Sequence, residues 1–339
     1  MPISTALVGF GLAGRVFHGP FLADDGRYRL DTVVTSAPER VADAARLHPH
    51  ARVVATLDEA LARGPELVVV ATPPASHVPV ARAALEAGCA VVVDKPMCAD
   101  PRAGWELVRR AEELGRPLTV FQNRRWDSEF LTLRRLLAQG ALGEVWRFES
   151  RIERWKTHER RAWKAAATWR EGGGVLFDLG SHLLDQALVL FGPAAEVHVE
   201  LAAHRGGSDD EAFVSIRHEN GVRSHLTVST TTPQPGPRMR VHGSAGSFVK
   251  VTGDVQEAQL ASGMSPSAPQ YGREPAEAAG VLGVGDEARP VPSEPGRYQE
   301  FYRLLAEALR GGGPLPVDPR ESLAVIELIA AAHARSAGP

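Results

Sequence analysis

Hydrophobic residues in the first third of the chain come in short continuous runs, separated by longer segments of helical periodicity. These runs are 3–8, 30–35, 52–54, 66–72 and 89–96. Strands that are apolar at every position and alternate with helices are typical of a parallel sheet covered on both faces. The pattern therefore predicts an alternating βαβαβ arrangement up to about residue 121.

After residue 121 the pattern changes to strands with alternating hydrophobic and polar positions, joined by turns such as Glu219-Asn220-Gly221. The periodicity predicts helices over 127–139, 176–191, 297–310 and 319–335. The segment 255–296 is dense in Gly, Pro, Ser and Ala, which predicts a long loop. We therefore predict an α/β domain over 1–121 and an α+β domain over 122–339 with a large open mixed or antiparallel sheet.

The composition is that of an ordinary globular protein. The 339 residues favour two domains, and a formal net charge of −3 provides no global positive field to attract nucleic acid or anionic lipid. The N-terminus lacks the features of a signal peptide, and no apolar run approaches the roughly 20 residues that span a bilayer. Cys89 and Cys98 lie in or beside a buried run, so we expect reduced thiols and a cytoplasmic protein without membrane contact.

The stretch VGFGLAG places glycines at 9, 11 and 14 between the first strand and the first helix. In this context the pattern predicts a Rossmann domain that binds a dinucleotide, because Gly9 permits a tight turn, Gly11 admits a pyrophosphate and Gly14 allows close packing. A glycine-rich turn without a ligand is the alternative. The residues expected at the cofactor are Gly9, Phe10, Gly11, Leu12, Ala13 and Gly14.

The end of the second strand indicates which dinucleotide is bound. An NAD site places an acidic residue there, whereas this chain has Ser36, with Arg40 close behind. The missing carboxylate removes a repulsion and an arginine suits a phosphate, so NADP is favoured, with NAD possible. Arg40 as a solvated residue in a helix is the alternative.

Three titratable residues stand where chemistry is expected. Lys95 follows a strand whose carboxyl end faces the ligand crevice of such a sheet. Asp178 and His182 are four apart on an apolar helix, so they share a face, and Gly172 to Gly174 precede them. The alternatives are a lysine in a surface turn, a histidine bonded in the core, or two metal ligands, although no third ligand accompanies them and no metal is expected.

Four motifs in this order, GFGLAG, ATPPASH, DKP and GGGVLFDLGSH, resemble the Gfo/Idh/MocA family of NAD(P)-dependent oxidoreductases over essentially the whole chain. The stretches GRVFHGPFL, VFQNRRWDSEFLTLRRLL and EPGRYQEFYRLLAEAL are similar to the branch that contains NADP-dependent scyllo-inositol 2-dehydrogenases. The family's usual triplet is Glu-Lys-Pro, and here Asp94 replaces the glutamate. The shorter side chain puts any contact of Asp94 with the nicotinamide in question.

The resemblance implies a dehydrogenase or reductase for a cyclic polyol or sugar. Lys95 would then donate to the substrate oxygen, His182 would act as the base, and Asp178 would bind an adjacent hydroxyl or orient the histidine. Thr72, Pro73 and His77 would border the nicotinamide. Further candidate substrate contacts, for which a solvated basic face is the alternative, are Asn123, Arg154, His158 and Arg170.

Two other functions fit the same fold. One is a ketoreductase of deoxysugar biosynthesis, and the other is a regulator that senses NADP without catalysis. The intact Lys95, Asp178 and His182 favour an enzyme. We also expect the apolar strands of the second domain to present an open sheet face, which predicts a homo-oligomer, either a dimer or a tetramer.

Overall fold

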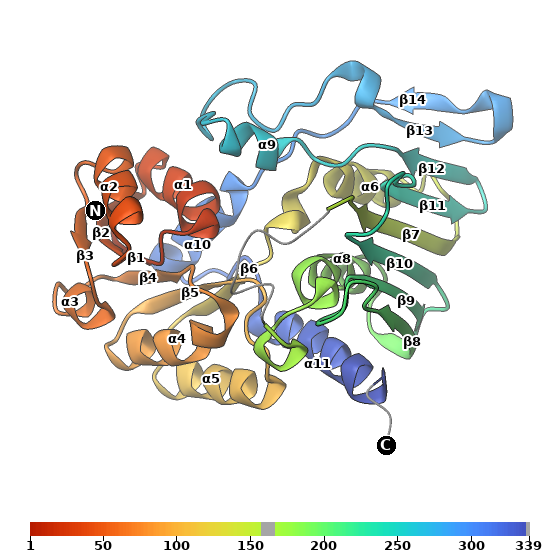
Figure 1. The fold of residues 1–339 in the computed structure, drawn as a ribbon. Coiled ribbons are helices and arrows are strands. Elements are labelled where there is room, and N and C mark those ends of the chain that lie inside the picture. The colour runs from red at the N-terminus through yellow and green to blue at the C-terminus, as the bar shows by residue number, and fades with distance from the viewer. Residues whose placement is uncertain (157–166, 337–339) are drawn as a thin grey trace. The chain divides into compact units, whose positions relative to one another are not determined.

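The computed structural model describes residues 1–156 and 167–336, and the chain divides into two compact units (Figure 1). Unit 1 comprises Met1–Asn123, Gln256–Tyr271 and Tyr298–Leu323. Unit 2 comprises Arg124–Val255, Gly272–Arg297 and Ala324–Pro339. Two late segments therefore belong to unit 1, whereas the boundary predicted from the sequence places everything after residue 121 in the second domain.

Unit 1 is built on a six-stranded parallel sheet of order β3-β2-β1-β4-β5-β6. Its strands are β1 (Ile3–Val8), β2 (Tyr28–Val34), β3 (Arg52–Val54), β4 (Leu67–Val70), β5 (Ala90–Asp94) and β6 (Leu118–Phe121). The predicted parallel sheet is confirmed. Every residue of β4 and β6 is buried, as strands covered on both faces require, and Cys89 and Cys98 are free, buried thiols.

Helices cover both faces of this sheet, with α4 and α5 on one face and α1 and α10 on the other (Figure 1). The helices of unit 1 are α1 (Gly19–Asp24), α2 (Pro38–Leu47), α3 (Leu57–Leu61), α4 (His77–Glu86), α5 (Pro101–Glu113), α9 (Gln256–Ala261) and α10 (Gln299–Gly311). A π-helical turn, η1 (Ala13–His18), precedes α1, and a short 3₁₀ turn occurs at η2 (Pro74–Ser76). A second 3₁₀ turn, η3 (Asn123–Trp126), begins at the last residue of this segment of unit 1 and belongs mainly to unit 2.

Helix α10 belongs to unit 1 because its aromatic residues complete the core of that unit. The ring of Phe301 meets the ring of Phe121 edge to face, with centroids 4.8 Å apart. Tyr302 stacks on Phe21 and accepts, through its backbone carbonyl, a 2.6 Å hydrogen bond from the Tyr28 hydroxyl. These contacts join residues more than 170 positions apart, which local periodicity does not reveal.

Unit 2 is built on an eight-stranded mixed sheet of order β14-β13-β12-β11-β7-β10-β9-β8, in which only β7 and β10 pair in parallel. The predicted mixed sheet is confirmed. Its strands are β7 (Val145–Glu153), β8 (Ala194–Ala202), β9 (Glu211–His218), β10 (Arg223–Ser229), β11 (Met239–Gly243), β12 (Gly246–Lys250), β13 (Gly280–Gly283) and β14 (Arg289–Val291). Its helices are α6 (Ser128–Ala138), α8 (Ser181–Phe191) and most of α11 (Pro319–Ser336).

The two faces of this sheet differ in chemistry. The buried face carries apolar side chains such as Phe148, Val241 and Phe248. The opposite face was expected to be apolar, and this is wrong: its paired positions are mainly charged or polar. One row across the face contains Glu196, Arg217, Arg223, Arg147 and His242. Alternation along each strand places this polar set on the face opposite the core.

The long loop predicted over 255–296 is also wrong in part. This segment forms α9 and a hairpin, β13 and β14, which extends one edge of the sheet in unit 2 (Figure 1). Strands of three or four residues are too short for their periodicity to stand out. Pro290 lies in the edge strand, where a missing backbone N–H is tolerated.

One helical stretch, Trp169–Phe191, is long and apolar enough to span a membrane by length and composition alone. Within the structure 72% of its most apolar window is buried inside the protein. This burial is what a core helix shows, because its apolar surface is already covered by the fold.

Candidate active site

The glycine-rich turn after β1 has room for a dinucleotide. Gly9 has a φ of +97°, and a Cβ on it would lie 2.6 Å from the Ala71 carbonyl oxygen. A Cβ on Gly14 would lie 2.0 Å from the Gly9 carbonyl oxygen, so both positions exclude a side chain. Gly11 has open space where a Cβ would stand. A pyrophosphate can approach its backbone there, at the start of η1, so these residues fit an NAD(P) cofactor.

The other residues predicted in this turn differ in exposure. The side chain of Phe10 is buried, with its ring edge against His48, so only its backbone is available to a ligand. Leu12 is 48% exposed, so its side chain is open to a ligand or to solvent. Ala13 is half-buried at the first position of η1.

The end of β2 carries no acidic side chain. Thr35 is buried and its N–H bonds to the Val54 carbonyl oxygen, whereas Ser36 is exposed. Arg40 is an exposed residue in the first turn of α2. The position that would hold a 2′-hydroxyl acceptor is thus occupied by a small hydroxyl side chain, with a guanidinium nearby in sequence.

His77 joins the loops that follow β4 and β5. Its two ring nitrogens lie 2.9 Å from the Pro96 carbonyl oxygen and 2.8 Å from the Thr72 carbonyl oxygen, and the side chain is buried. Pro73 is exposed and Thr72 is half-buried. His77 therefore holds the two loops together, whereas Thr72 and Pro73 keep part of their surface accessible.

Lys95 lies directly after β5, where the Lys95–Pro96 peptide bond is cis. Its backbone N–H donates a 2.9 Å hydrogen bond to Oδ1 of Asp94. Burial by itself would raise the pKa of Asp94, but the contact with His18 and the positive charge of Lys95 lower that pKa below its usual value. Asp94 is therefore a carboxylate that binds the backbone of its neighbour.

In unit 2, the helix that bears Asp178 and His182 begins at a crowded glycine segment. Gly172 and Gly174 have positive φ values of 80° and 90°. A Cβ on Gly174 would lie 2.0 Å from Oδ1 of Asp209. Oδ2 of the same carboxylate accepts a 2.8 Å hydrogen bond from the Leu176 N–H, so Asp209 satisfies a free donor of the first helical turn. Sequence reasoning missed this residue.

The first turn of this helix is not α-helical as predicted. Residues Leu176–Gly180 form a π-helical turn, η5, and α8 follows from Ser181. The Ser181 hydroxyl donates a 2.6 Å hydrogen bond to the Phe177 carbonyl oxygen, inside the wider turn. Asp178 is half-buried in the π turn and His182 is buried in α8, at 4% exposure. Single π turns of this kind occur frequently at functional sites.

Two polar side chains on α8 attach it to η3, the segment that follows β6. Asp185 accepts hydrogen bonds from Nε and Nη2 of Arg125 at 2.8 and 2.5 Å, and both side chains are buried. Gln186 donates a 2.7 Å hydrogen bond to the Arg124 carbonyl oxygen. Bidentate pairs of this type hold a defined geometry. They fix the rotation of the helix that carries His182.

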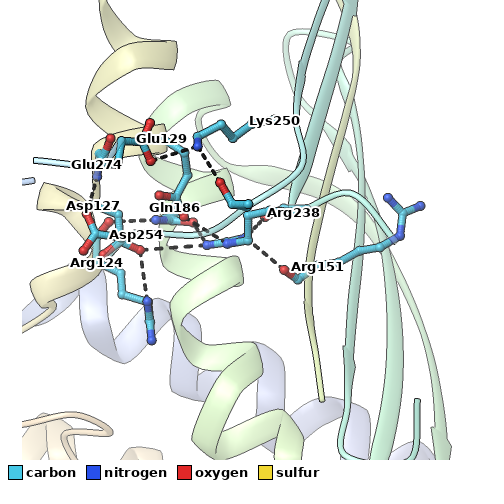
Figure 2. A network of polar contacts seen from close by, with 12 residues as sticks. Arg124, Asp127, Glu129, Arg151, Gln186, Arg238, Lys250, Asp254 and Glu274 are labelled. Carbon is cyan, nitrogen blue, oxygen red and sulfur yellow. Dashed lines mark hydrogen bonds and ion pairs between the residues drawn. The ribbon is translucent and has the colours of Figure 1, made fainter. Parts of the chain in front are cut away.

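A buried network of charged residues continues from α8 across unit 2 (Figure 2). Arg238 lies at its centre, with Nε 2.9 Å from Oε1 of Glu129 and Nη1 2.5 Å from the Ser150 hydroxyl. Nη2 of the same guanidinium donates to Gln186 at 3.4 Å. Lys250, with no exposed surface, donates to Glu274 at 2.9 Å. The network ties α6, α8 and the sheet together.

The remaining predicted contacts lie in different surroundings. Asn123 is buried at the end of unit 1, at 7% exposure. Arg154 directly follows β7 and is half-buried. Arg170 is exposed, with its guanidinium 4.5 Å from the centroid of the Trp169 ring. His158 lies outside the described residues.

Each unit thus brings together its own set of predicted residues. In unit 1, the glycine turn, Ser36, Thr72 and Lys95 follow the carboxyl ends of β1, β2, β4 and β5, which are neighbours in the sheet. In unit 2, Asp178 and His182 share one helical segment. Within residues 1–156 and 167–336, no three His, Cys, Asp or Glu side chains gather as metal ligands would.

Comparisons with known proteins agree with this arrangement. Residues 3–122 match the oxidoreductase family with an NAD-binding Rossmann fold, and residues 130–249 match the GFO/IDH/MocA C-terminal domain. The chain is 35% identical to the scyllo-inositol 2-dehydrogenase (NADP(+)) IolW of Bacillus subtilis, over 97% of this chain and 92% of that protein. It is 37% identical to the oxidoreductase YdgJ of Escherichia coli, over 96% of this chain and 94% of that protein.

A solved structure shows the same fold. The oxidoreductase YvaA of Bacillus subtilis superposes with a TM-score of 0.92 at 34% identity, covering 99% of this chain and 96% of that one. The chain therefore belongs to the Gfo/Idh/MocA family. It is an NAD(P)-dependent oxidoreductase that acts on CH–OH groups.

Proposed function

We propose that this enzyme is an NADP-dependent dehydrogenase that interconverts a secondary alcohol and a ketone on a cyclic polyol of the inositol type. The observation that carries the proposal lies within unit 1. The open backbone at Gly11 and the side chain of Lys95 follow the carboxyl ends of β1 and β5, and β4 alone separates these strands. A phosphate cradle and an ammonium at one edge of a parallel sheet suit a dinucleotide with a substrate beside it.

The preference for NADP rests on the end of β2. Ser36 and Arg40 replace the carboxylate that would bind a 2′-hydroxyl, and an arginine suits a phosphate. The similarity to the NADP-dependent enzyme of Bacillus subtilis supports the same preference.

In the proposed reaction, the glycine turn after β1 would hold the dinucleotide, whose nicotinamide would supply the hydride chemistry at the alcohol carbon. Lys95 donates a hydrogen bond to the substrate oxygen and stabilises the negative charge that develops there. His182 removes the hydroxyl proton during oxidation and returns it during reduction. Asp178 binds a neighbouring hydroxyl of the ring or orients His182. The anchors at Asp185 and Asp209 keep the helix of these two residues in place.

The choice of an inositol-type ring rests on the similarity to a scyllo-inositol 2-dehydrogenase. We further propose that the protein is a homo-oligomer and that it works in the cytoplasm. Sedimentation as a monomer at micromolar concentration would contradict the oligomer.

A substrate panel tests this function. Inositol isomers and monosaccharides are assayed with NADP and with NAD, using the wild type, Lys95→Ala and His182→Ala. His198→Ala is the matched control, because His198 is an exposed histidine on β8. We expect turnover of an inositol with NADP, a fall of about 100-fold or more in the first two variants, and no change in the control. Turnover that is unaffected by both substitutions would refute the assigned roles.

A further inference from the structure

Two sequence motifs that take no part in the proposed chemistry each contribute a buried residue close to Asp94, the residue before Lys95. His18 comes from the stretch GRVFHGPFL, and Tyr302 comes from EPGRYQEFYRLL near the end of the chain. Both residues are buried with no exposed surface, and both belong to unit 1. Such a pair is unusual, because buried imidazole and phenol groups must satisfy their polar atoms internally.

His18 lies between Tyr302 and Asp94. Its Nδ1 is 2.6 Å from the Tyr302 hydroxyl oxygen, and its Nε2 is 3.6 Å from Oδ1 of Asp94. The imidazole also packs on the Phe121 ring, with centroids 4.5 Å apart. The phenol, the imidazole and the carboxylate therefore form a chain that begins in the core and ends at the residue before Lys95.

The Tyr302 hydroxyl and the Asp94 carboxylate determine where the proton of His18 resides. Burial raises the pKa of Tyr302 well above its usual value, so the hydroxyl keeps its proton. The Asp94 carboxylate can only accept, so in a neutral imidazole Nε2, which faces it, carries the proton, and Nδ1 of His18 accepts from the phenol 2.6 Å away. A neutral imidazole that accepts at Nδ1 carries its proton on Nε2. That N–H faces Asp94, and Nε2 has no hydrogen-bond partner at normal distance among the described residues.

Oδ1 of Asp94 therefore interacts with two N–H groups. One is Nε2–H of His18, and the other is the backbone N–H of Lys95 at 2.9 Å. Because the same oxygen accepts the Lys95 N–H and faces Nε2 of His18, the imidazole can restrict how the carboxylate turns and, through it, the start of the Lys95 backbone. Support of this kind, from a side chain that does not touch the substrate, is a common way to hold a functional group in place.

We propose that His18 is a positioning residue for Lys95: it accepts a hydrogen bond from the Tyr302 hydroxyl on one side and, on the other, steadies the Asp94 carboxylate that binds the lysine backbone. The proposal rests on the proposed function in one respect, since it takes Lys95 as the group that acts on the substrate. Its contacts lie wholly within unit 1.

Two amide substitutions separate the two contacts of His18. In His18→Gln the side-chain amide reaches the place of Nε2 and keeps a donor for Asp94, but the Tyr302 hydroxyl loses its acceptor. In His18→Asn the amide reaches the place of Nδ1, which keeps the Tyr302 contact and removes the one to Asp94. His218→Asn is the control, because His218 is a fully buried, hydrogen-bonded histidine of unit 2.

The two His18 variants should lose different properties: His18→Asn should lose turnover, and His18→Gln should lose stability. We expect His18→Asn to lower kcat roughly tenfold or more with little change in the Kd for NADPH, because a displaced lysine loses reactivity. His18→Gln should retain most of kcat but melt several degrees lower, because a buried hydroxyl is unpaired. His218→Asn should lower Tm without lowering kcat. Equal loss of kcat in both His18 variants, or loss in neither, would overturn the proposal.

A second measurement does not depend on turnover. The chain has only four lysines, so reductive methylation with ¹³C-formaldehyde gives few NMR signals, and Lys95→Arg assigns the one from Lys95. We expect this signal to move in His18→Asn and to stay in His18→Gln. An unmoved signal in His18→Asn would overturn the positioning role. If the wild type turns over no polyol but the signal moves as expected, the proposed function fails while the positioning role stands.

Discussion

Replacing Asp209 by Asn should stabilise the protein at neutral pH, although it removes a charge next to the helix that bears His182. Burial raises the pKa of Asp209 to about 6 from a usual 3.8, and the hydrogen bonds from Leu176 and Val175 only partly offset this. The folded state favours the protonated form of the Asp209 carboxyl. The stabilisation that this protonated form provides is therefore fully present below about pH 4. That contribution is lost as the pH rises through about 6.

The size of the effect follows from the shift. A difference of about two pKa units corresponds to about 3 kcal/mol, since each unit is worth about 1.4 kcal/mol. An asparagine resembles the protonated carboxyl and still accepts from the Leu176 N–H. Asp209→Asn should therefore melt roughly 6 to 12 °C above the wild type at pH 7.5 and only about a third as far above it at pH 4.5.

Thermal unfolding followed by circular dichroism between pH 4.5 and 8 measures this difference. His333, whose Nε2 lies 3.5 Å from Oδ1 of Asp209, also titrates: burial lowers its pKa to about 4. Its contribution is lost as the pH falls from about 6.5 toward 4, so the difference between the two proteins above pH 6.5, where the folded-state imidazole is neutral in both, reports Asp209.

The neighbouring residue gives a control of opposite sign. Burial alone would raise the pKa of Asp210, but the hydrogen bonds from His204 and Arg205 lower it. Asp210→Asn should therefore destabilise the protein at neutral pH, with the difference vanishing in acid. Two results would refute the reasoning about Asp209. One is a melting temperature of Asp209→Asn below that of the wild type at pH 7.5, and the other is a difference in melting temperature that is the same at every pH.

Three further substitutions test the site. Gly11→Val should leave Tm unchanged within a few degrees, because the space beside it is empty, but should weaken NADPH binding in a fluorescence titration at least tenfold. Ser36→Asp should raise the ratio of kcat/KM with NAD to that with NADP by about tenfold or more, and an unchanged ratio would show that β2 does not select the cofactor. Asp185→Asn should destabilise unit 2 by about 3 kcal/mol in urea unfolding, because it leaves the Arg125 charge buried without its ionic partner.

The features that local pattern determines could be predicted from the sequence. The spacing of Gly9, Gly11 and Gly14 placed the phosphate turn between β1 and the first helix, where the structure has it. Valine-rich runs gave the parallel strands, and the position of Lys95 directly after such a run put it at the carboxyl end of β5. Each of these follows from fewer than about ten consecutive residues.

The features that depend on long-range packing could not be predicted. His18 and Tyr302 are 284 positions apart, and only the folded chain brings them together behind Asp94. The Arg125–Asp185 pair spans 60 positions. The π turn at Asp178 also escaped prediction, because residue periodicity does not distinguish one wide turn within a helix. Polar partners inside a core leave no pattern in the neighbouring sequence. The stretches that contain His18 and Tyr302 could therefore be noticed as motifs, but the contact between the two residues could not be predicted.

The transfer of an isotope tests the central claim most directly. The wild type is incubated with NADP and with scyllo-inositol deuterated at its ring carbons, and the reduced cofactor is analysed by mass spectrometry and NMR. We predict one deuterium in the reduced nicotinamide ring, and none with Lys95→Ala on the same timescale. A wild type that binds NADP but yields no deuterated cofactor from any ring polyol, or a Lys95→Ala variant that transfers deuterium as fast as the wild type, would contradict the account.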